Sequence, residues 1–66
     1  MSPERFAVRL KALRAQKGMT QEALAKKAGV SRQYLARMEM GRHDPPLSRL
    51  RKLAKALGVK VRKLIE

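Results

Sequence analysis

The stretch TQEALAKKAGVSRQYLARMEMG, residues 20–41, decides the fold of this chain because it predicts two short helices separated by a tight turn. Thr20 can cap the first of these helices, and Gly29 can end it in a left-handed conformation. Ser31 can then cap the second helix, which Gly41 ends. The stretch therefore predicts a helix, a turn and a second helix in immediate succession.

The second of these helices has two faces of opposite character. Leu35 and Met38 fall on one side when residues are placed at about 100° each. The residues on the opposite side are Arg32, Gln33, Ala36, Arg37 and Met40. Arg and Gln make bidentate hydrogen bonds to guanine and adenine edges in the major groove. A short helix that presents them as a stripe is typical of a protein that reads double-stranded DNA.

The composition indicates one small domain, over residues 1–66, with a polyanionic partner. The chain carries 17 Lys and Arg against five Asp and Glu, a formal net charge of +12. So strong a basic excess implies either nucleic acid or an anionic membrane as partner. A chain of this size buries only about 60% of its unfolded surface, so we expect a modest core of aliphatic side chains.

Several kinds of chemistry are excluded by what the sequence lacks. The absence of Cys excludes disulfides, thiolate metal sites and cysteine nucleophiles. His43 has no His or Cys companion, so we expect an exposed loop residue or a phosphate neighbour rather than a metal ligand. We therefore expect no enzyme activity, no cofactor and no small-molecule substrate. No apolar run has the length of a signal peptide or a membrane span, which predicts a cytoplasmic protein, nucleoid-associated when bound to DNA.

The rest of the chain predicts three more helices and no strand. A first helix begins at the Ser-Pro-Glu sequence of residues 2–4 and ends at Gly18. A fourth helix opens at Pro46 and ends at Gly58, and a fifth, short helix follows over residues 61–65. The helices within the stretch that opens this section are expected over 21–28 and 32–40. The fold class is all-α, a compact bundle of five short helices.

Apolar positions at helical spacing predict the hydrophobic core. They are Phe6, Leu10, Leu13, Leu24, Val30, Leu35, Met38, Leu47, Leu50, Leu53, Leu57, Val59 and Leu64. Ala25, Ala28 and Ala54 share the same faces. No cofactor is needed to explain these residues.

Three features together resemble the phage repressor and Cro type of helix-turn-helix domain. They are LKALRAQKGMTQEALAKKAGVS at residues 10–31, the Glu39-x-Gly41 ending of the next helix, and Pro45 followed by LSRLRKLAKALGV at residues 47–59. The resemblance covers nearly the whole chain and fixes spacing across four helices. It implies a compact bundle of five short helices, in which the second and third form the DNA-binding unit.

The resemblance also implies roles for individual residues. Base edges would be contacted by Arg32, Gln33, Ala36 and Arg37. For phosphate contact we expect Gln21, Ser31, Tyr34, Met40, Arg42 and His43. Arg14 and Glu39 match a pair that joins the first helix to the end of the third. The alternative for each charged residue is an ordinary solvated position, and the Tyr34 ring can instead pack against the second helix.

Two positions depart from the family pattern. The fifth helix of such domains commonly begins with Ser or Pro followed by an acid, whereas here Lys60, Arg62 and Lys63 occupy its first turn. Cations there oppose the helix dipole. Met40 stands where a polar residue is frequent. We expect most cations of the last two helices to be solubilising charge that adds a general attraction to DNA.

The sequence favours a sequence-specific DNA-binding module of transcription-regulator type. The alternative is a protein-interaction adaptor on the same helical fold, for which Val8, Tyr34 and Met40 are the exposed apolar candidates. A membrane-surface or non-specific RNA binder would need one long amphipathic helix, which the caps and glycines interrupt. We expect a monomer in solution, two copies of which can pair on adjacent half-sites.

Overall fold

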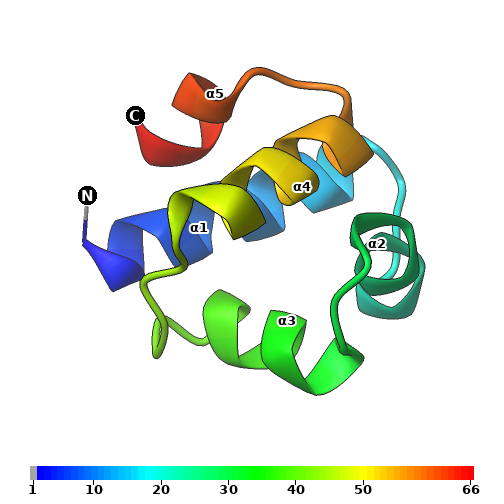
Figure 1. The fold of residues 1–66 in the computed structure, drawn as a ribbon, viewed down its shortest axis with the longest axis horizontal. Coiled ribbons are helices and arrows are strands. Elements are labelled where there is room, and N and C mark those ends of the chain that lie inside the picture. The colour runs from blue at the N-terminus through cyan, green and yellow to red at the C-terminus, as the bar shows by residue number, and fades with distance from the viewer. Residues whose placement is uncertain (1) are drawn as a thin grey trace.

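The computed structural model describes residues 2–66 and contains five α-helices (Figure 1). They are α1 (Pro3–Gln16), α2 (Gln21–Ala28), α3 (Arg32–Glu39), α4 (Leu47–Leu57) and α5 (Val61–Ile65). No strand occurs within the described residues. The prediction of an all-α bundle of five short helices is confirmed.

Three hydroxyl side chains begin the first three helices, as the sequence predicts. Ser2 Oγ accepts the Arg5 N–H at 3.1 Å, Thr20 Oγ1 accepts the Ala23 N–H at 3.0 Å, and Ser31 Oγ accepts the Tyr34 N–H at 3.0 Å. Each cap satisfies a backbone donor that the first turn of a helix leaves unpaired. These caps fix where α1, α2 and α3 start.

Glycines in left-handed conformation end α2 and follow α3. Gly29 has φ 71° at the end of α2, and only Val30 and Ser31 separate it from α3. Gly41 has φ 76°, which lets the Arg42 N–H turn back to the Arg37 carbonyl at 3.1 Å. Residues with a Cβ rarely adopt this conformation. These turns set the short connection between α2 and α3 and release the chain from α3.

The helices pack around α1 and α4, with α3 and α5 on different sides of the molecule. The larger contacts of α3 are with α1 and α2, whereas those of α5 are with α1 and α4. Figure 1 shows α5 at the top and α3 at the bottom, with α1 and α4 between them. The Cα atoms extend over 24 × 23 × 21 Å. This arrangement leaves the outer side of α3 open to a partner.

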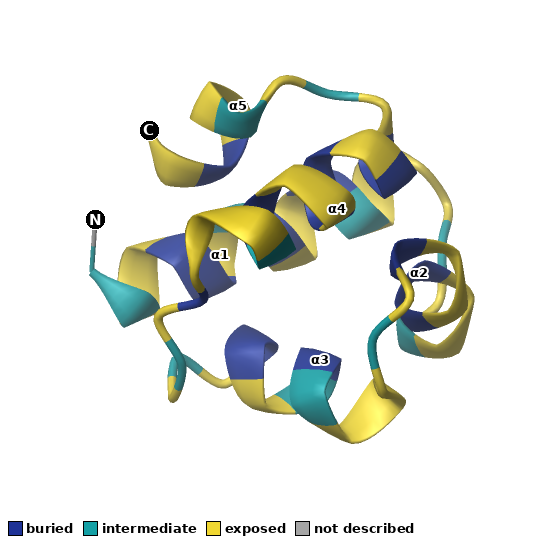
Figure 2. Ribbon diagram, in the orientation of Figure 1, coloured by how far each residue is buried: buried dark blue, intermediate teal, exposed yellow. Residues whose placement is uncertain are grey.

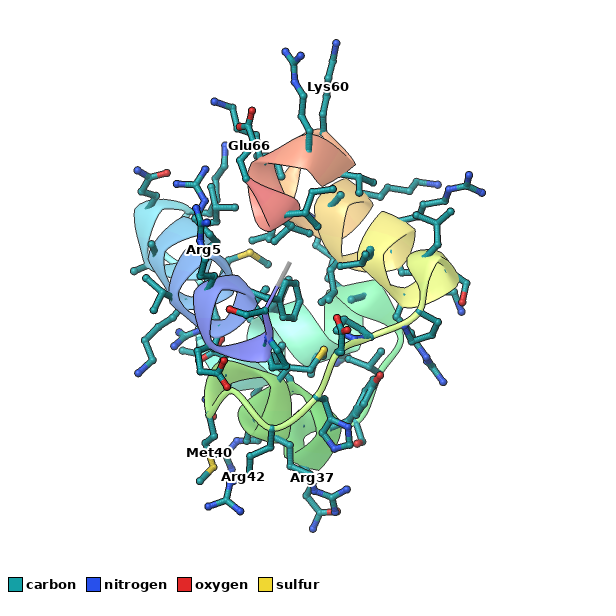
Figure 3. All side chains as sticks on the ribbon, turned by 90° about the vertical axis from the view of Figure 1, so that its left-hand side faces the viewer. Arg5, Arg37, Met40, Arg42, Lys60 and Glu66 are labelled. Carbon is teal, nitrogen blue, oxygen red and sulfur yellow. The ribbon has the colours of Figure 1, made fainter. Side chains whose placement is uncertain are left out.

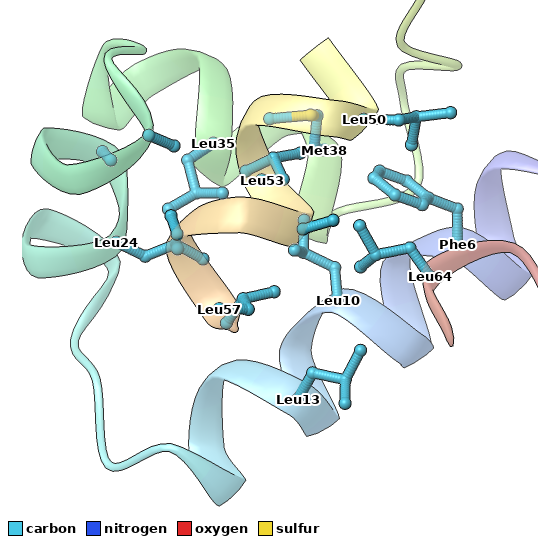
Figure 4. Close-up of a cluster of buried hydrophobic side chains, with 14 residues drawn as sticks. Phe6, Leu10, Leu13, Leu24, Leu35, Met38, Leu50, Leu53, Leu57 and Leu64 are labelled. Atoms are coloured by element: carbon cyan, nitrogen blue, oxygen red, sulfur yellow. The ribbon is translucent and has the colours of Figure 1, made fainter. Parts of the chain in front are cut away.

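One hydrophobic core joins all five helices (Figure 4). Its fully buried large side chains are Phe6, Leu10, Leu24, Leu35, Met38, Leu53 and Leu64. Burying such a side chain contributes about 1.5–3 kcal/mol. The sequence did not single out Ala7 and Ala56, which are also buried. Small side chains there let neighbouring helices approach closely.

The prediction that Leu47 belongs to the core is wrong, since 53% of it is exposed. Leu47 continues the apolar spacing of Leu50, but it is the first residue of α4. Side chains on a helix lean toward its N-terminus, so Leu47 projects beyond the helices that cover Leu50. Val30 and Val59 are only partly buried and pack against the edge of the core.

Two helix boundaries and the place of one cation differ slightly from the prediction. Pro46 is the extended N-cap residue of α4 rather than its first helical residue, and its carbonyl accepts the N–H groups of Arg49 and Leu50. Met40 is the C-cap of α3, so that helix ends at Glu39. Lys60 is the N-cap of α5, which leaves Arg62 and Lys63 as the cations within the helix.

Candidate nucleic-acid interface

The outer side of α3 forms an exposed stripe of polar and charged residues (Figure 2). Arg32, Gln33 and Arg37 are exposed, and Ala36 is half-buried between them and the core. The opposite side of the helix is held in the core by Leu35 and Met38. The helix therefore cannot rotate about its own axis, and the exposed stripe keeps one orientation.

The residues that follow the stripe lie at the same end of the molecule. Figure 3 shows the Arg37, Met40 and Arg42 side chains pointing away from the core, from α3 and the loop after it. Arg42 is exposed, and 64% of Met40 is exposed. An apolar side chain so exposed beside two guanidinium groups is available to contact sugar rings. The arrangement brings one predicted base-contacting residue, Arg37, to the same end as two predicted backbone contacts, Met40 and Arg42.

The starts of α2 and α3 line one open hollow. Its walls are formed by Arg14, Thr20, Gln21, Glu22 and Arg32. The first turn of α2 carries backbone N–H groups without intrahelical partners and the positive end of the helix dipole. A phosphate beside this turn and a base edge beside Arg32 would be neighbours.

An ion pair between Arg14 and Glu39 ties α1 to the end of α3. Arg14 Nε donates to Glu39 Oε2 at 2.6 Å, and Arg14 Nη2 donates to Glu39 Oε1 at 3.0 Å. The exposed fractions of the two side chains are 18% and 2%. Hydrogen bonding to Glu39 raises the pKa of Arg14, which burial opposes and the attraction between the charges reinforces. The Met19 carbonyl accepts a further bond from Arg14 Nη1 at 2.8 Å.

Glu39 also holds Gln21, a contact that sequence reasoning missed. Gln21 Nε2 donates to Glu39 Oε1 at 3.0 Å. Because an ionised carboxylate only accepts hydrogen bonds, it fixes the amide with its NH₂ group toward Glu39. One N–H of that group is engaged and the other remains available to a phosphate. Gln21 is thus oriented by the same carboxylate that anchors α3.

Tyr34, His43 and Arg49 form a small cluster beside α3. The rings of Tyr34 and His43 meet edge to face with centroids 5.4 Å apart, and the Arg49 guanidinium carbon lies 5.5 Å from the Tyr34 centroid. These ring contacts involve the loop and α4, and Tyr34 also packs against the core. His43 was predicted to be an exposed loop residue or a phosphate neighbour, and because it is half-buried only the second alternative remains. Sequence reasoning did not connect Arg49 with this region.

Ser31 has a structural task as well as an exposed position. Its hydroxyl oxygen accepts the Tyr34 N–H, and its own proton is still able to donate. Over residues 2–66, no cluster of three His, Cys, Asp or Glu side chains could hold a metal ion. None of the described helices is both long and apolar enough to cross a membrane.

Comparisons with known proteins agree with this geometry. A family model described as helix-turn-helix matches residues 10–64. The immunity repressor of Bacillus phage phi105 is 46% identical over 57 residues, covering 86% of this chain but only 40% of the repressor. An uncharacterised helix-turn-helix transcriptional regulator of Methanocaldococcus jannaschii is 51% identical over 53 residues, covering 80% of each chain. This chain therefore spans about two fifths of the first relative and most of the second.

The fold is also similar to solved structures. The restriction-modification controller protein C.AhdI from Aeromonas hydrophila has a TM-score of 0.91 and is 39% identical, with 94% of each chain covered. A hypothetical transcription factor from Neisseria has a TM-score of 0.93 and is 33% identical over the full length of this chain, which covers 76% of that protein.

Proposed function

Because this chain belongs to the helix-turn-helix family and is a DNA-binding regulator of repressor type, we propose which of its residues contact bases and which contact phosphates. The exposed stripe of α3 carries the proposal, because its other side is locked in the core. A rigid helix that offers guanidinium and amide groups fits the major groove of double-stranded DNA.

Base reading is assigned to the first two turns of α3. Arg32 and Gln33 directly follow the Ser31 cap, where the helix end would enter the groove. Arg37 lies about one turn further, and Ala36 offers a methyl group to a thymine methyl. Bidentate bonds from Arg to guanine and from Gln to adenine would supply the sequence preference.

Phosphate contacts fix the position of the protein on DNA but carry no sequence information. Gln21 and the first turn of α2 would hold one phosphate, and Arg42 would hold another beyond the end of α3. Ser31, Tyr34, Met40 and His43 border these positions and would contact the same sugar-phosphate backbone. The hollow supports this division, because Gln21 and Arg32 both line it.

The adaptor function receives no support from the exposed apolar residues. Val8, Met40, Leu47 and Ile65 lie on or beside four different helices. We propose that regulation acts through occupancy of DNA rather than catalysis, with one copy on each half-site and monomers in solution. The protein would then work in the cytoplasm, at the nucleoid when bound. A binding selection from a randomised duplex library would identify the target sequence.

Arg32→Ala is expected to weaken binding to the preferred site by about 1–3 kcal/mol and to relax the preference at one base pair, a guanine. Arg42→Ala should weaken binding to all sequences about equally, because an Arg that follows Gly41 reaches only the backbone. Both variants should be measured against a panel of single-base changes in the selected site. A uniform loss for Arg32→Ala together with a changed base preference for Arg42→Ala would show that these roles are wrongly assigned.

Gln21→Ala is expected to weaken binding to every sequence by about 1 kcal/mol, the typical value of one hydrogen bond. Stability should change little, because Glu39 keeps both bonds from Arg14. The same duplex panel and a urea denaturation curve measure the two effects. A large loss of stability with unchanged binding would make Gln21 a scaffold residue instead.

A further inference from the structure

The last two helices carry positive charge that the α3 interface does not use. From Pro45 to Ile65 the sequence contains seven Lys and Arg and no acid. Six of these cations are exposed, and the three at α5 define what we call the C-terminal basic surface: Lys60, Arg62 and Lys63. Uniform positive charge is the electrostatic footprint of a nucleic-acid-binding face.

This surface lies away from the α3 stripe. The main packing partners of α5 are α1 and α4, and those of α3 are α1 and α2. In Figure 3, Lys60 points outward at the opposite end of the molecule from Arg37 and Arg42. A duplex held by α3 would therefore leave α5 facing solvent.

Dissolved salt screens the electrostatic interaction between the two faces of the molecule. The Cα atoms span 21–24 Å along each principal axis. The Debye length is about 10 Å at 0.1 M salt, so opposite faces lie about two screening lengths apart. Cations on α5 then add little attraction to a duplex at α3.

The cations of α5 belong to a helix of only five residues, with Lys60 as its N-cap and Arg62 and Lys63 within it. Its C-terminal end is fastened to α1, since Arg9 Nε donates to the Lys63 carbonyl and Arg5 Nη2 to the Glu66 carbonyl, both at 3.1 Å. The cations of α5 are therefore presented on a fixed backbone.

We propose that the C-terminal basic surface binds a second DNA duplex, so that one copy bridges two duplexes. The proposal rests on the proposed function for the first duplex. A membrane surface fits less well, because Leu64 is buried, Val61 is half-buried, and Ile65 is 43% exposed, which leaves little apolar area to insert. Duplex DNA carries one charge per about 1.7 Å and is already concentrated near a bound copy.

The test measures capture of a second duplex. A bead-bound duplex with the selected target sequence is saturated with protein at 0.15 M salt, and a fluorescent duplex of unrelated sequence is added. We expect capture with the wild type and at least about tenfold less with the triple variant Lys60→Glu, Arg62→Glu, Lys63→Glu. Affinity for the first duplex should change less than about twofold, because the α3 face is screened from α5.

The matched control is Lys11→Glu, Lys17→Glu, Lys26→Glu, which makes the same charge change at exposed positions outside the surface. It should keep capture in proportion to the protein bound on the beads. The test variant should fold about as well as the wild type in a thermal melt, because all three substituted side chains are exposed.

Retained capture by the α5 variant would overturn the proposal and point to bridging by protein dimers. Equal loss in the control variant would also overturn it, in favour of general charge. Stronger capture of double-stranded RNA than of DNA would replace the proposed ligand. If the wild type binds the first duplex but captures no second duplex, the bridging proposal is wrong and the proposed function is unaffected. No binding to the first duplex would instead contradict the proposed function.

Discussion

Glu39→Ala is expected to destabilise the fold by about 1–3 kcal/mol, because it leaves the part-buried Arg14 without its partner. Glu39 is 2% exposed at its side chain and accepts from both Arg14 and Gln21. A chain of this length has a total stability of about 3–10 kcal/mol. The variant should therefore unfold at a clearly lower urea concentration than the wild type, which urea denaturation followed by circular dichroism measures.

Two further variants isolate the cause. Glu22→Ala removes an exposed acid of α2 and should stay within about 0.5 kcal/mol of the wild type. Arg14→Met with Glu39→Leu replaces both charges by apolar groups and should be more stable than Glu39→Ala alone, because no charge is left without a partner. If Glu39→Ala matched Glu22→Ala, the ion pair would contribute nothing to the fold.

DNA affinity is expected to fall about a thousandfold between 50 and 200 mM salt, with a log–log slope near −5 for about six neutralised phosphates. Counterion release from the phosphates causes this dependence, and the net charge of +12 supplies the cations. Fluorescence anisotropy with a single labelled duplex, at protein concentrations too low for bridging, gives the slope.

Two variants show which residues contribute to that salt dependence. Arg42→Ala should reduce its magnitude by about 1, because one cation leaves a phosphate. Gln21→Ala should weaken binding at every salt concentration without changing the slope, since an amide releases no counterion. A salt-independent affinity for the wild type would rule out electrostatic docking.

Much of this protein's structure depends on local interactions, and for that reason the sequence alone determined that part of the structure. Caps at Ser2, Thr20 and Ser31 and the left-handed turns at Gly29 and Gly41 involve residues only a few positions apart. Such contacts form in any chain with these residues at these spacings. The same regular spacing separated the buried side of α3 from its exposed stripe before any packing was known.

Tertiary structure alone decided contacts between residues far apart in sequence. The bond from Gln21 to Glu39, and the cluster of Tyr34, His43 and Arg49, depend on the angles at which helices cross. Leu47 has the periodicity of a core residue, yet the end of α4 leaves it uncovered. Periodicity shows which side of a helix is apolar. The neighbouring helices decide how far along its length that side is covered and which polar side chains meet between helices.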